Sequence, residues 1–236
     1  MPYSEVKMNK IVIITGGANG LGLELARKCA ACGYNVCIVD IDSKATQKAK
    51  DELSCEAFVG NIACPELAST VISELAQKGY EVYALFNNGG APSFKAPTEY
   101  TSADVERCLE GLKGMIYFTT AVLNGKKSSS ETKIINIMSS AALRGNANES
   151  VYCATKWGER GYTESLKKAY EGTNTRIYGV YPGGIDTDFY KDQRHYVSLE
   201  KQHTFMSPVD LAEVIVDNVF SSKHLVIEDL VINRIK

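Results

Sequence analysis

The stretch Lys10-Ile-Val-Ile-Ile-Thr-Gly-Gly-Ala-Asn-Gly-Leu-Gly22 joins a β-branched apolar run to a cluster of glycines, and a helical pattern follows as far as Cys32. A short apolar run of this kind is typical of a buried strand, and Gly33 is typical of a residue that closes a helix. The stretch therefore predicts a strand, a glycine turn and a helix. Residues 35–40 follow as a second buried strand, which begins a βαβ unit.

The same alternation continues to the end of the chain. We expect further strands at residues 57–59, 82–86, 134–138, 176–181 and 225–235, and helices at 43–53, 65–78, 102–123 and 208–220. A further helix is expected to carry Tyr152 and to run to about Tyr170. This order predicts a parallel sheet that is covered by helices on both faces. Residues 1–7 are interpreted as a flexible extension or an expression scar, and residues 8–236 as a single domain.

Composition excludes several classes of protein. The 236 residues include 26 basic and 28 acidic side chains, and no basic run suggests a nucleic-acid partner. The longest apolar runs are far shorter than the roughly 20 residues of a membrane-spanning helix, and no signal peptide is evident. We expect a cytoplasmic protein that neither binds nor crosses a membrane. The seven cysteines, Cys29 and Cys32 among them, are interpreted as reduced thiols.

The glycines after the first strand indicate a dinucleotide site. Gly16, Gly20 and Gly22 would let the backbone approach a pyrophosphate, whose charge is met by N–H groups at the start of the following helix. The spacing is Thr-Gly-x-x-x-Gly-x-Gly rather than the commoner Gly-x-Gly-x-x-Gly. A glycine turn can also end a strand for conformational reasons alone, so its place between a strand and a helix supplies the supporting context.

Asp40, at the end of the second strand, bears on the choice of dinucleotide. Its carboxylate can accept hydrogen bonds from both adenosine ribose hydroxyls and would repel a 2′-phosphate. Ile41 follows it instead of an arginine, and neither Ala18 nor Asn19 adds positive charge. The sequence thus predicts NAD(H) in preference to NADP(H). The alternative is that this aspartate only forms a turn.

Tyr152 and Lys156 are spaced for acid–base chemistry. Residues four apart on a helix share a face, so the ammonium group can stand beside the phenol and lower its pKa. Ser139 lies thirteen residues before the tyrosine, at the expected end of a strand. The same spacing also occurs where a packed tyrosine lies under a lysine whose charge reaches solvent.

Five motifs, taken in order, resemble the short-chain dehydrogenase/reductase family. They are Thr15-Gly16-x-x-x-Gly20-x-Gly22, Asn87-Asn88-x-Gly90, Ser139, Tyr152-x-x-x-Lys156 and Pro182-Gly183-x-x-x-Thr187. The resemblance covers nearly the whole chain from Met8. It implies a doubly wound Rossmann-type sheet of about seven strands, a nicotinamide cofactor, and hydride exchange with an alcohol or carbonyl. It also implies homodimers or homotetramers built on the two long helices of the second half.

The resemblance assigns roles to individual residues. Tyr152 would be the acid in carbonyl reduction and the base in alcohol oxidation, Ser139 would bind the reacting oxygen, and Lys156 would hold the nicotinamide ribose. The expected cofactor-binding residues are Gly16, Asn19, Gly20, Leu21, Gly22, Asp40, Asn61, Ile62, Asn87, Gly89, Tyr152, Lys156, Pro182, Gly183, Ile185 and Thr187. No metal is expected. The asparagines could instead tie a turn.

Three positions depart from the family pattern. Asn61 stands where the family often has aspartate, and Gly89 replaces the usual alanine. The third departure is Gly111, where many members carry an asparagine that holds a water linking the lysine to solvent. Its absence raises the question of how Lys156 exchanges its proton.

The substrate side is expected in residues 91–100 and 184–207. The second segment mixes aromatic residues with charges, and we interpret it as a mobile lid over a moderately polar substrate, which hydrogen exchange with and without ligands would test. His195 and His203 are interpreted as surface residues. The sequence predicts an NAD(H)-dependent oxidoreductase of secondary alcohols or ketones. The alternative, motivated by Gly111, is a dinucleotide-binding regulatory or signalling protein with little turnover.

Overall fold

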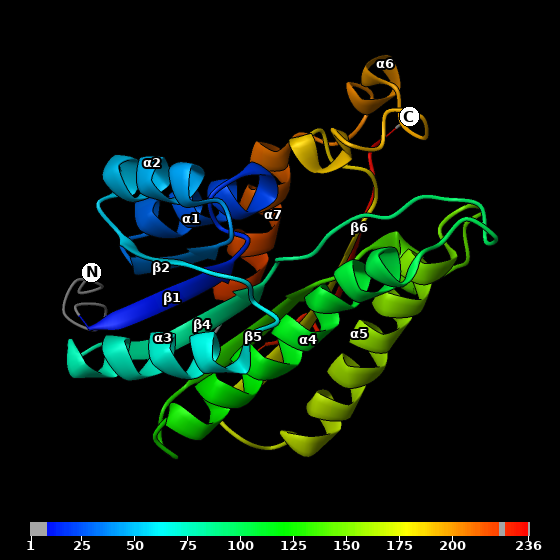
Figure 1. The fold of residues 1–236 in the computed structure, drawn as a ribbon. Coiled ribbons are helices and arrows are strands. Elements are labelled where there is room, and N and C mark those ends of the chain that lie inside the picture. Colours follow the sequence, from blue (N-terminus) through cyan, green and yellow to red (C-terminus); the bar gives the residue numbers. More distant parts are fainter. Residues whose placement is uncertain (1–8, 222–224, 236) are drawn as a thin grey trace.

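Seven parallel strands form one sheet in the computed structural model, which describes residues 9–221 and 225–235 (Figure 1). The strands are β1 (Lys10–Thr15), β2 (Asn35–Asp40), β3 (Glu56–Val59), β4 (Glu81–Asn87), β5 (Thr132–Ile137), β6 (Thr175–Pro182) and β7 (Asp229–Ile232). Their order across the sheet is β3-β2-β1-β4-β5-β6-β7. The predicted α/β fold, a doubly wound Rossmann-type parallel sheet, is confirmed. The extension predicted at residues 1–7 lies outside the described residues.

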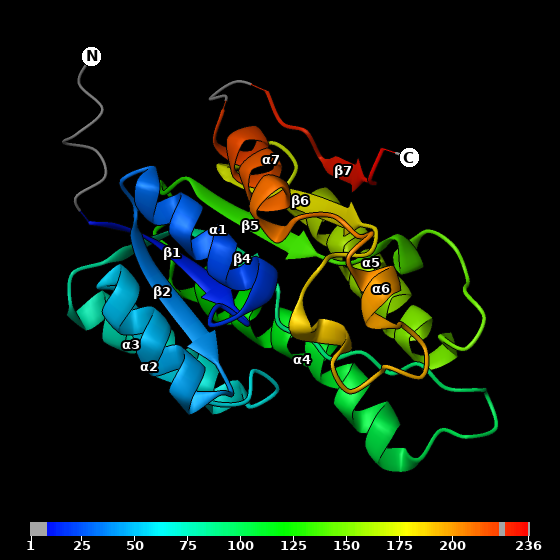
Figure 2. The ribbon, with the colours of Figure 1, turned by 90° about the horizontal axis from the view of Figure 1, so that it is seen from above.

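Helices cover both faces of the sheet. They are α1 (Gly20–Ala31), α2 (Ser43–Leu53), α3 (Pro65–Gln77), α4 (Ser102–Gly125), α5 (Ser150–Ala169), the short α6 (Leu199–Gln202) and α7 (Pro208–Phe220). Figures 1 and 2 show α1, α2 and α7 on one face, and α3, α4 and α5 on the other. No helix among the described residues is both long and apolar enough to cross a bilayer.

Side chains alternate between the two faces of the sheet along β1, and this explains why helices must cover both faces. Val12 and Ile14 belong to the core under α1 and α7, whereas Ile11 and Ile13 belong to the core under α3 and α4. All four side chains are completely buried. A strand with apolar residues on both sides can lie only inside a sheet with helices on each face.

The last strand is shorter than the sequence predicts. Asp229–Ile232 pairs with β6, whereas Leu225 and Ile227, which the sequence placed in the same strand, are exposed outside it. At the edge of the sheet only one neighbour supplies hydrogen bonds, so apolar content alone does not fix the strand's length.

The order of the strands creates a crevice. From β1 the chain runs outward to β2 and β3, and then crosses back to place β4 on the other side of β1. The chain leaves β1 toward one side of the sheet and leaves β4 toward the other side. The two loops therefore diverge, and a crevice opens between them beyond the carboxyl ends of β1 and β4. In open parallel sheets, ligands bind at this switch point.

Candidate active site

The loop after β1 is shaped by glycines. Gly16 has a φ of +62° and Gly20 a φ of +52°, both in the left-handed region that favours glycine. Gly22 is required for a different reason, because a Cβ there would lie 1.9 Å from the carbonyl oxygen of Gly16. The glycines thus let the loop turn closely onto the first turn of α1.

The start of α1 suits a phosphate group. Asn19 is the N-cap residue, and its side chain makes no capping hydrogen bond to α1 within the described part of the chain. The first N–H groups of a helix and the positive end of its dipole attract anions. The loop and the helix start therefore fit the pyrophosphate of a dinucleotide.

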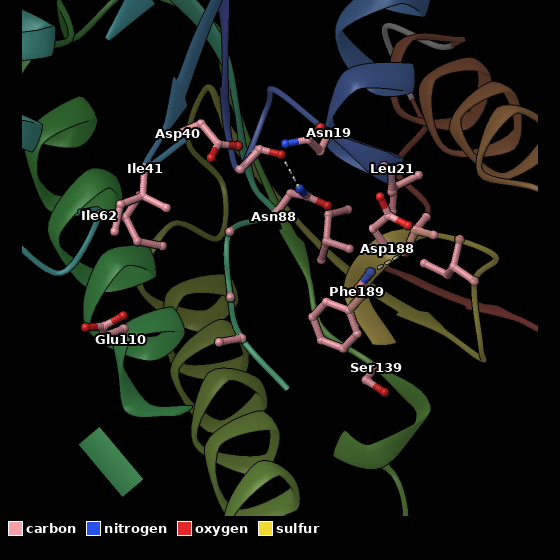
Figure 3. A pocket seen from close by; sticks show the side chains of 18 of the residues that line it. Asn19, Leu21, Asp40, Ile41, Ile62, Asn88, Glu110, Ser139, Asp188 and Phe189 are labelled. Carbon is pink, nitrogen blue, oxygen red and sulfur yellow. Dashed lines mark hydrogen bonds between the residues drawn. The ribbon is translucent and has the colours of Figure 1, made fainter. Parts of the chain in front are cut away.

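A cavity of about 550 Å³ extends from this loop along the carboxyl ends of the strands. In Figure 3, Asp40 and Ile41 lie at one end of the cavity, and Ser139 and Phe189 at the other. The predicted site residues that line it are Gly16, Asn19, Gly20, Leu21, Asp40, Asn61, Ile62, Gly89, Ser139, Tyr152, Lys156, Pro182, Gly183, Ile185 and Thr187. The tertiary structure thus brings the glycine loop and the Ser139, Tyr152 and Lys156 set to one continuous cavity.

Two residues predicted to bind the cofactor lie outside the lining. Gly22 packs against the loop instead, as described above. The Asn87 side chain is buried, and its Nδ2 donates to Thr119 Oγ1 at 2.9 Å and to Asn136 Oδ1 at 2.8 Å. Asn87 therefore ties β4 to α4 and β5, which corrects its expected contact with the cofactor.

Asn88 lines the cavity in place of Asn87. Its Nδ2 lies 3.1 Å from the carbonyl oxygens of both Thr15 and Gly16, so it fixes the path of the glycine loop. Successive side chains at a strand end point in opposite directions, so a shift of one residue changes which side chain reaches the cavity. That alternation was the signal in the sequence that could have identified Asn88.

The Asp40 carboxylate is already bound to the protein backbone. Its Oδ2 accepts from the N–H of Ala18 at 3.1 Å, and its Oδ1 accepts from the N–H of Asp42 at 3.1 Å. These contacts hold the glycine loop against the end of β2. Asp40 therefore forms a local turn, as the alternative interpretation allowed, and it also binds the glycine loop, which its place in the sequence did not reveal.

Ser139 and Tyr152 stand at the other end of the cavity. Ser139 follows β5, and its Oγ accepts a hydrogen bond from the N–H of Ala141 at 3.1 Å. Burial raises the pKa of Tyr152, a hydrogen bond with Ser139 opposes this rise, and the negative charge of Glu159 adds to it. The net direction is upward, so burial outweighs the lowering of this pKa that was expected from Lys156.

Lys156 is held in a buried ion pair. Its Nζ lies 2.8 Å from Oε2 and 3.1 Å from Oε1 of Glu159, one helical turn further along α5. The Glu159 residue is only 1% exposed. Burial raises the pKa of Glu159, and Lys156 acts in the opposite direction. The ammonium beside Tyr152 thus carries its own counter-charge.

Gly111 provides the space for this carboxylate. A Cβ on Gly111 would lie 3.2 Å from Glu159 Oε1 and 3.4 Å from the Cα of Gly90, which lines the cavity. Because Gly111 on α4 has no side chain, the carboxylate of Glu159 on α5 can pack directly against the α4 backbone. The three-residue spacing of Lys156 and Glu159 was the available signal in the sequence.

An aromatic cluster closes the cavity near Tyr152. It consists of Phe94, Tyr152, Phe189, Tyr190 and Tyr196. The Phe94 ring stands edge-on to Tyr152 at 5.5 Å between centroids, and it stacks on Tyr196 at 4.7 Å. The two segments predicted to meet the substrate, residues 91–100 and 184–207, therefore contact each other here.

The two histidines of the second segment make separate contacts. His195 Nε2 lies 2.9 Å from the carbonyl oxygen of Phe94, and His203 Nδ1 lies 3.1 Å from Asp186 Oδ2. Within residues 9–221 and 225–235, no group of three or more histidine, cysteine or acidic side chains is placed to hold a metal ion.

Several lining residues were not among the predicted catalytic or cofactor-binding residues, although Ala91 and residues 188–191 lie in the two segments expected on the substrate side. They are Ile41, Asp42, Gly60, Asn88, Gly90, Ala91, Glu110, Ile137, Met138, Asp188, Phe189, Tyr190 and Lys191. Most are neighbours of predicted residues. Glu110 on α4 differs, because its Oε1 accepts from Asn61 Nδ2 at 2.9 Å across the crevice, a contact that spacing along the chain does not reveal.

A doubly wound parallel sheet, a glycine loop at its switch point and a serine, tyrosine and lysine at the same cavity define a dinucleotide-binding oxidoreductase of the Rossmann type. The family model for short chain dehydrogenase matches residues 10–197. The chain belongs to the short-chain dehydrogenase family, as the resemblance predicted.

Relatives extend this similarity over most of the chain. Sepiapterin reductase of Chlorobaculum tepidum is 25% identical over 238 residues, which cover 95% of this chain and 96% of that protein. The NADP-dependent 3-hydroxy acid dehydrogenase of Salmonella typhi is 28% identical, over 87% of each chain. A solved structure, the closed form of serine dehydrogenase complexed with NADP⁺, matches with a TM-score of 0.87 and 25% identity, over 95% of this chain and 94% of that one.

The predicted preference for NAD(H) is contradicted by these relatives. The serine dehydrogenase structure holds NADP⁺, and the Salmonella enzyme is NADP-dependent. The physical reason lies in Asp40, because both of its carboxylate oxygens accept backbone hydrogen bonds. An aspartate at this strand end can therefore serve the loop, and its presence does not by itself reject a 2′-phosphate.

Proposed function

We propose that this chain is an NADP(H)-dependent oxidoreductase that interconverts a secondary alcohol and a ketone on a small molecule. The observation that carries the proposal is the single cavity that joins the glycine loop to Ser139, Tyr152 and Lys156. When bound, the cofactor would supply or accept the hydride. The chain's own side chains then have to bind the reacting oxygen and move one proton.

Tyr152 would move that proton. In reduction its phenol donates to the carbonyl oxygen, and in oxidation its phenolate accepts from the alcohol. The upward shift of its pKa keeps the phenol protonated near neutral pH, which favours its role as an acid in reduction. The hydroxyl of Ser139 would donate a second hydrogen bond to the same oxygen, because its Oγ already accepts from Ala141.

Lys156 would orient the ribose next to the nicotinamide. Two of the three N–H donors on its ammonium face the oxygens of Glu159, which leaves one donor for a ribose hydroxyl. Lys156 also lines the cavity with Tyr152, and its Nζ lies 5.7 Å from the centre of the tyrosine ring.

The backbone donors of the glycine loop and the start of α1 would hold the pyrophosphate. NADP(H) is inferred from the cofactors named for the relatives, and from the two hydrogen bonds that the Asp40 carboxylate accepts from the backbone. We further propose that the chain assembles as a homodimer or homotetramer through α4 and α5.

The function is tested with NADPH and a panel of ketones, and with NADP⁺ and the matching alcohols. We expect turnover by the unmodified protein, and NADPH affinity at least about tenfold higher than NADH affinity in a fluorescence titration. Tyr152→Phe is expected to abolish turnover and to leave NADPH binding nearly unchanged.

Each result decides between specific alternatives. Full turnover by Tyr152→Phe would contradict the mechanism. NADPH binding by the unmodified protein without oxidation or reduction of any compound in the panel would favour a dinucleotide-binding regulatory protein. The test between enzyme and regulatory protein is needed because Lys156 already has a partner within the protein, Glu159. The presence of this lysine at the cavity therefore does not by itself establish turnover.

A further inference from the structure

The wall between α4 and α5 contains a carboxylate beside the proposed proton-transfer site. Glu159 is 1% exposed and binds Lys156 through both of its oxygens. Lys156 and Gly90 line the cavity, and Gly111 borders the carboxylate from α4. Glu159 therefore lies directly behind the lysine, on its side away from solvent.

A buried ion pair of this kind is a poor source of stability. Removing two charges from water costs free energy that their mutual attraction often does not recover, and apolar residues of similar volume can serve as well. At Glu159 the effect of burial exceeds that of Lys156, because the pKa of the carboxyl is raised on balance. The position of the pair at the cavity wall points to a task in the chemistry rather than in folding.

The charged and titratable groups around the pair can be named element by element. On α5 there is Tyr152, and Glu149, the residue just before this helix, interacts electrostatically with Tyr152. On α4 there is Cys108, whose thiol interacts electrostatically with Lys156. The loop after β4 contributes Gly89 and Gly90, which carry no charge. Among the described residues, Lys156 is thus the cation that pairs with Glu159.

We propose that Glu159 is a positioning residue that holds Lys156 in place, offsets its charge and thereby controls the protonation of Tyr152. The inference rests on the function proposed above only where it concerns turnover. The geometry carries it: the carboxylate is bound to the lysine, the lysine stands beside the tyrosine, and Gly111 leaves room for this contact.

The direction of the effect follows from charge. A carboxylate near a phenol disfavours the phenolate, and it also neutralises the ammonium that would otherwise favour that phenolate. Glu159→Gln removes both effects while keeping the size of the side chain. Tyr152 should therefore ionise at lower pH in this variant.

The matched control is Glu164→Gln. Glu164 pairs with Lys167 at the same three-residue spacing on the same helix, but its side chain is 49% exposed. Solvent screens such a pair, so the control removes an equal charge from α5 without affecting the site. Glu159→Asp is a second variant, which retains a carboxylate.

Kinetics provide the first measurement. In alcohol oxidation, we expect the midpoint of the pH profile of kcat/KM to fall by about one pH unit in Glu159→Gln, which raises the rate about tenfold at pH values below both midpoints. Glu164→Gln should keep the midpoint of the unmodified protein, and Glu159→Asp should stay closer to it than Glu159→Gln does. A lower melting temperature with an unchanged midpoint would show a purely structural role and overturn the proposal.

The second measurement needs no turnover. The near-ultraviolet absorbance of the Tyr152 phenolate is obtained as the difference between each protein and the same protein with Tyr152→Phe. The phenolate should appear at lower pH in Glu159→Gln than in the unmodified protein or in Glu164→Gln.

The two measurements together separate the two proposals. If this shift occurs but no substrate is converted, the proposed function fails while the role of Glu159 stands. If substrates are converted but neither the midpoint nor the phenolate shifts, the role of Glu159 fails alone.

Discussion

Lys156 and Glu159 show how two side chains can change the chemistry of a third. Lys156 alone would favour the phenolate of Tyr152, as the four-residue spacing predicted. With Glu159 at 2.8 Å, the ammonium is largely neutralised, and burial of the phenol dominates its pKa. The spacing placed the lysine beside the tyrosine, but burial of the phenol, with a smaller contribution from the charge of Glu159, sets the net direction of the pKa shift upward.

Lys156→Met is expected to destabilise the protein, because it leaves the carboxylate of Glu159 buried without its cation. A cost of about 3–5 kcal/mol at pH 7 is typical when a buried ion pair loses one partner.

The cost of Lys156→Met should depend on pH. The raised pKa of Glu159 means that the folded state binds its proton more tightly than the unfolded state does, so stability is present below the ordinary carboxyl pKa and is lost as the pH rises toward the folded-state value. Urea unfolding at pH 5 and pH 7 measures this, and we expect a smaller loss at pH 5.

The double variant Lys156→Met with Glu159→Leu is the control. It replaces both charges with apolar side chains, and it should be at least as stable as the unmodified protein. Equal destabilisation in the single and double variants would show that packing of the lysine stem, rather than the unpaired charge, causes the loss.

Among the secondary-structure elements, the turn from β1 into α1 depends most directly on glycine. Two left-handed glycines and one close backbone contact let the first turn of the helix approach the end of the strand. Asn88 from β4's end and Asp40 from β2 hold this turn from either side. The turn is therefore a product of three strands, although its glycines are contiguous in the sequence.

Gly22→Ala tests this packing. The added methyl group would meet the carbonyl oxygen of Gly16, so the loop or the helix must shift. We expect a loss of about 1–3 kcal/mol in urea unfolding and weaker NADPH binding by fluorescence. Gly161→Ala is the matched control on α5, where nothing lies within 4 Å of the added carbon. That change should instead stabilise the protein by about 1 kcal/mol, and NADPH affinity should be unchanged. Normal NADPH affinity in Gly22→Ala would contradict the role of the close contact.

At the scale of the whole molecule, topology creates the site. The crossing from β3 to β4 opens the crevice, and the parallel direction of all strands brings the ends of β1, β2, β4, β5 and β6 to one edge. Residues as distant in sequence as Gly16 and Thr187 line one cavity because of this arrangement. In Figure 2, the segment with α6 lies over the same edge.

Trp157→Glu tests the proposed assembly through α4 and α5. Trp157 lies on α5 one residue after Lys156 and is 48% exposed, a large aromatic surface for a helix. A charge at this position should oppose burial of α5 against a second copy, so the variant should show a smaller mass than the unmodified protein in light scattering. Val209→Glu on α7, which is also 48% exposed, is the control and should leave the mass unchanged. An unmodified protein that is already monomeric would contradict the assembly itself.

Sequence patterns alone predicted the sheet, the succession of strands and helices along the chain, the glycine loop, and the positions of Ser139, Tyr152 and Lys156. These features depend on local patterns, namely apolar runs, turn residues and the helical period. The sequence also led to the short-chain dehydrogenase family, because five motifs occur in one order.

The neighbours of those residues follow from the packing of the folded chain. This packing turned Asn87 inward and Asn88 to the cavity, engaged Asp40 with the backbone, and placed Glu159 in the space beside Gly111. Hydrogen bonds and pKa values depend on atoms a few ångströms apart, and such atoms come from segments whose separation in the chain carries no information about their distance in space. For this reason the sequence located Tyr152 and Lys156, and the packing of α4 on α5 placed Gly111 beside the carboxylate that pairs with the lysine.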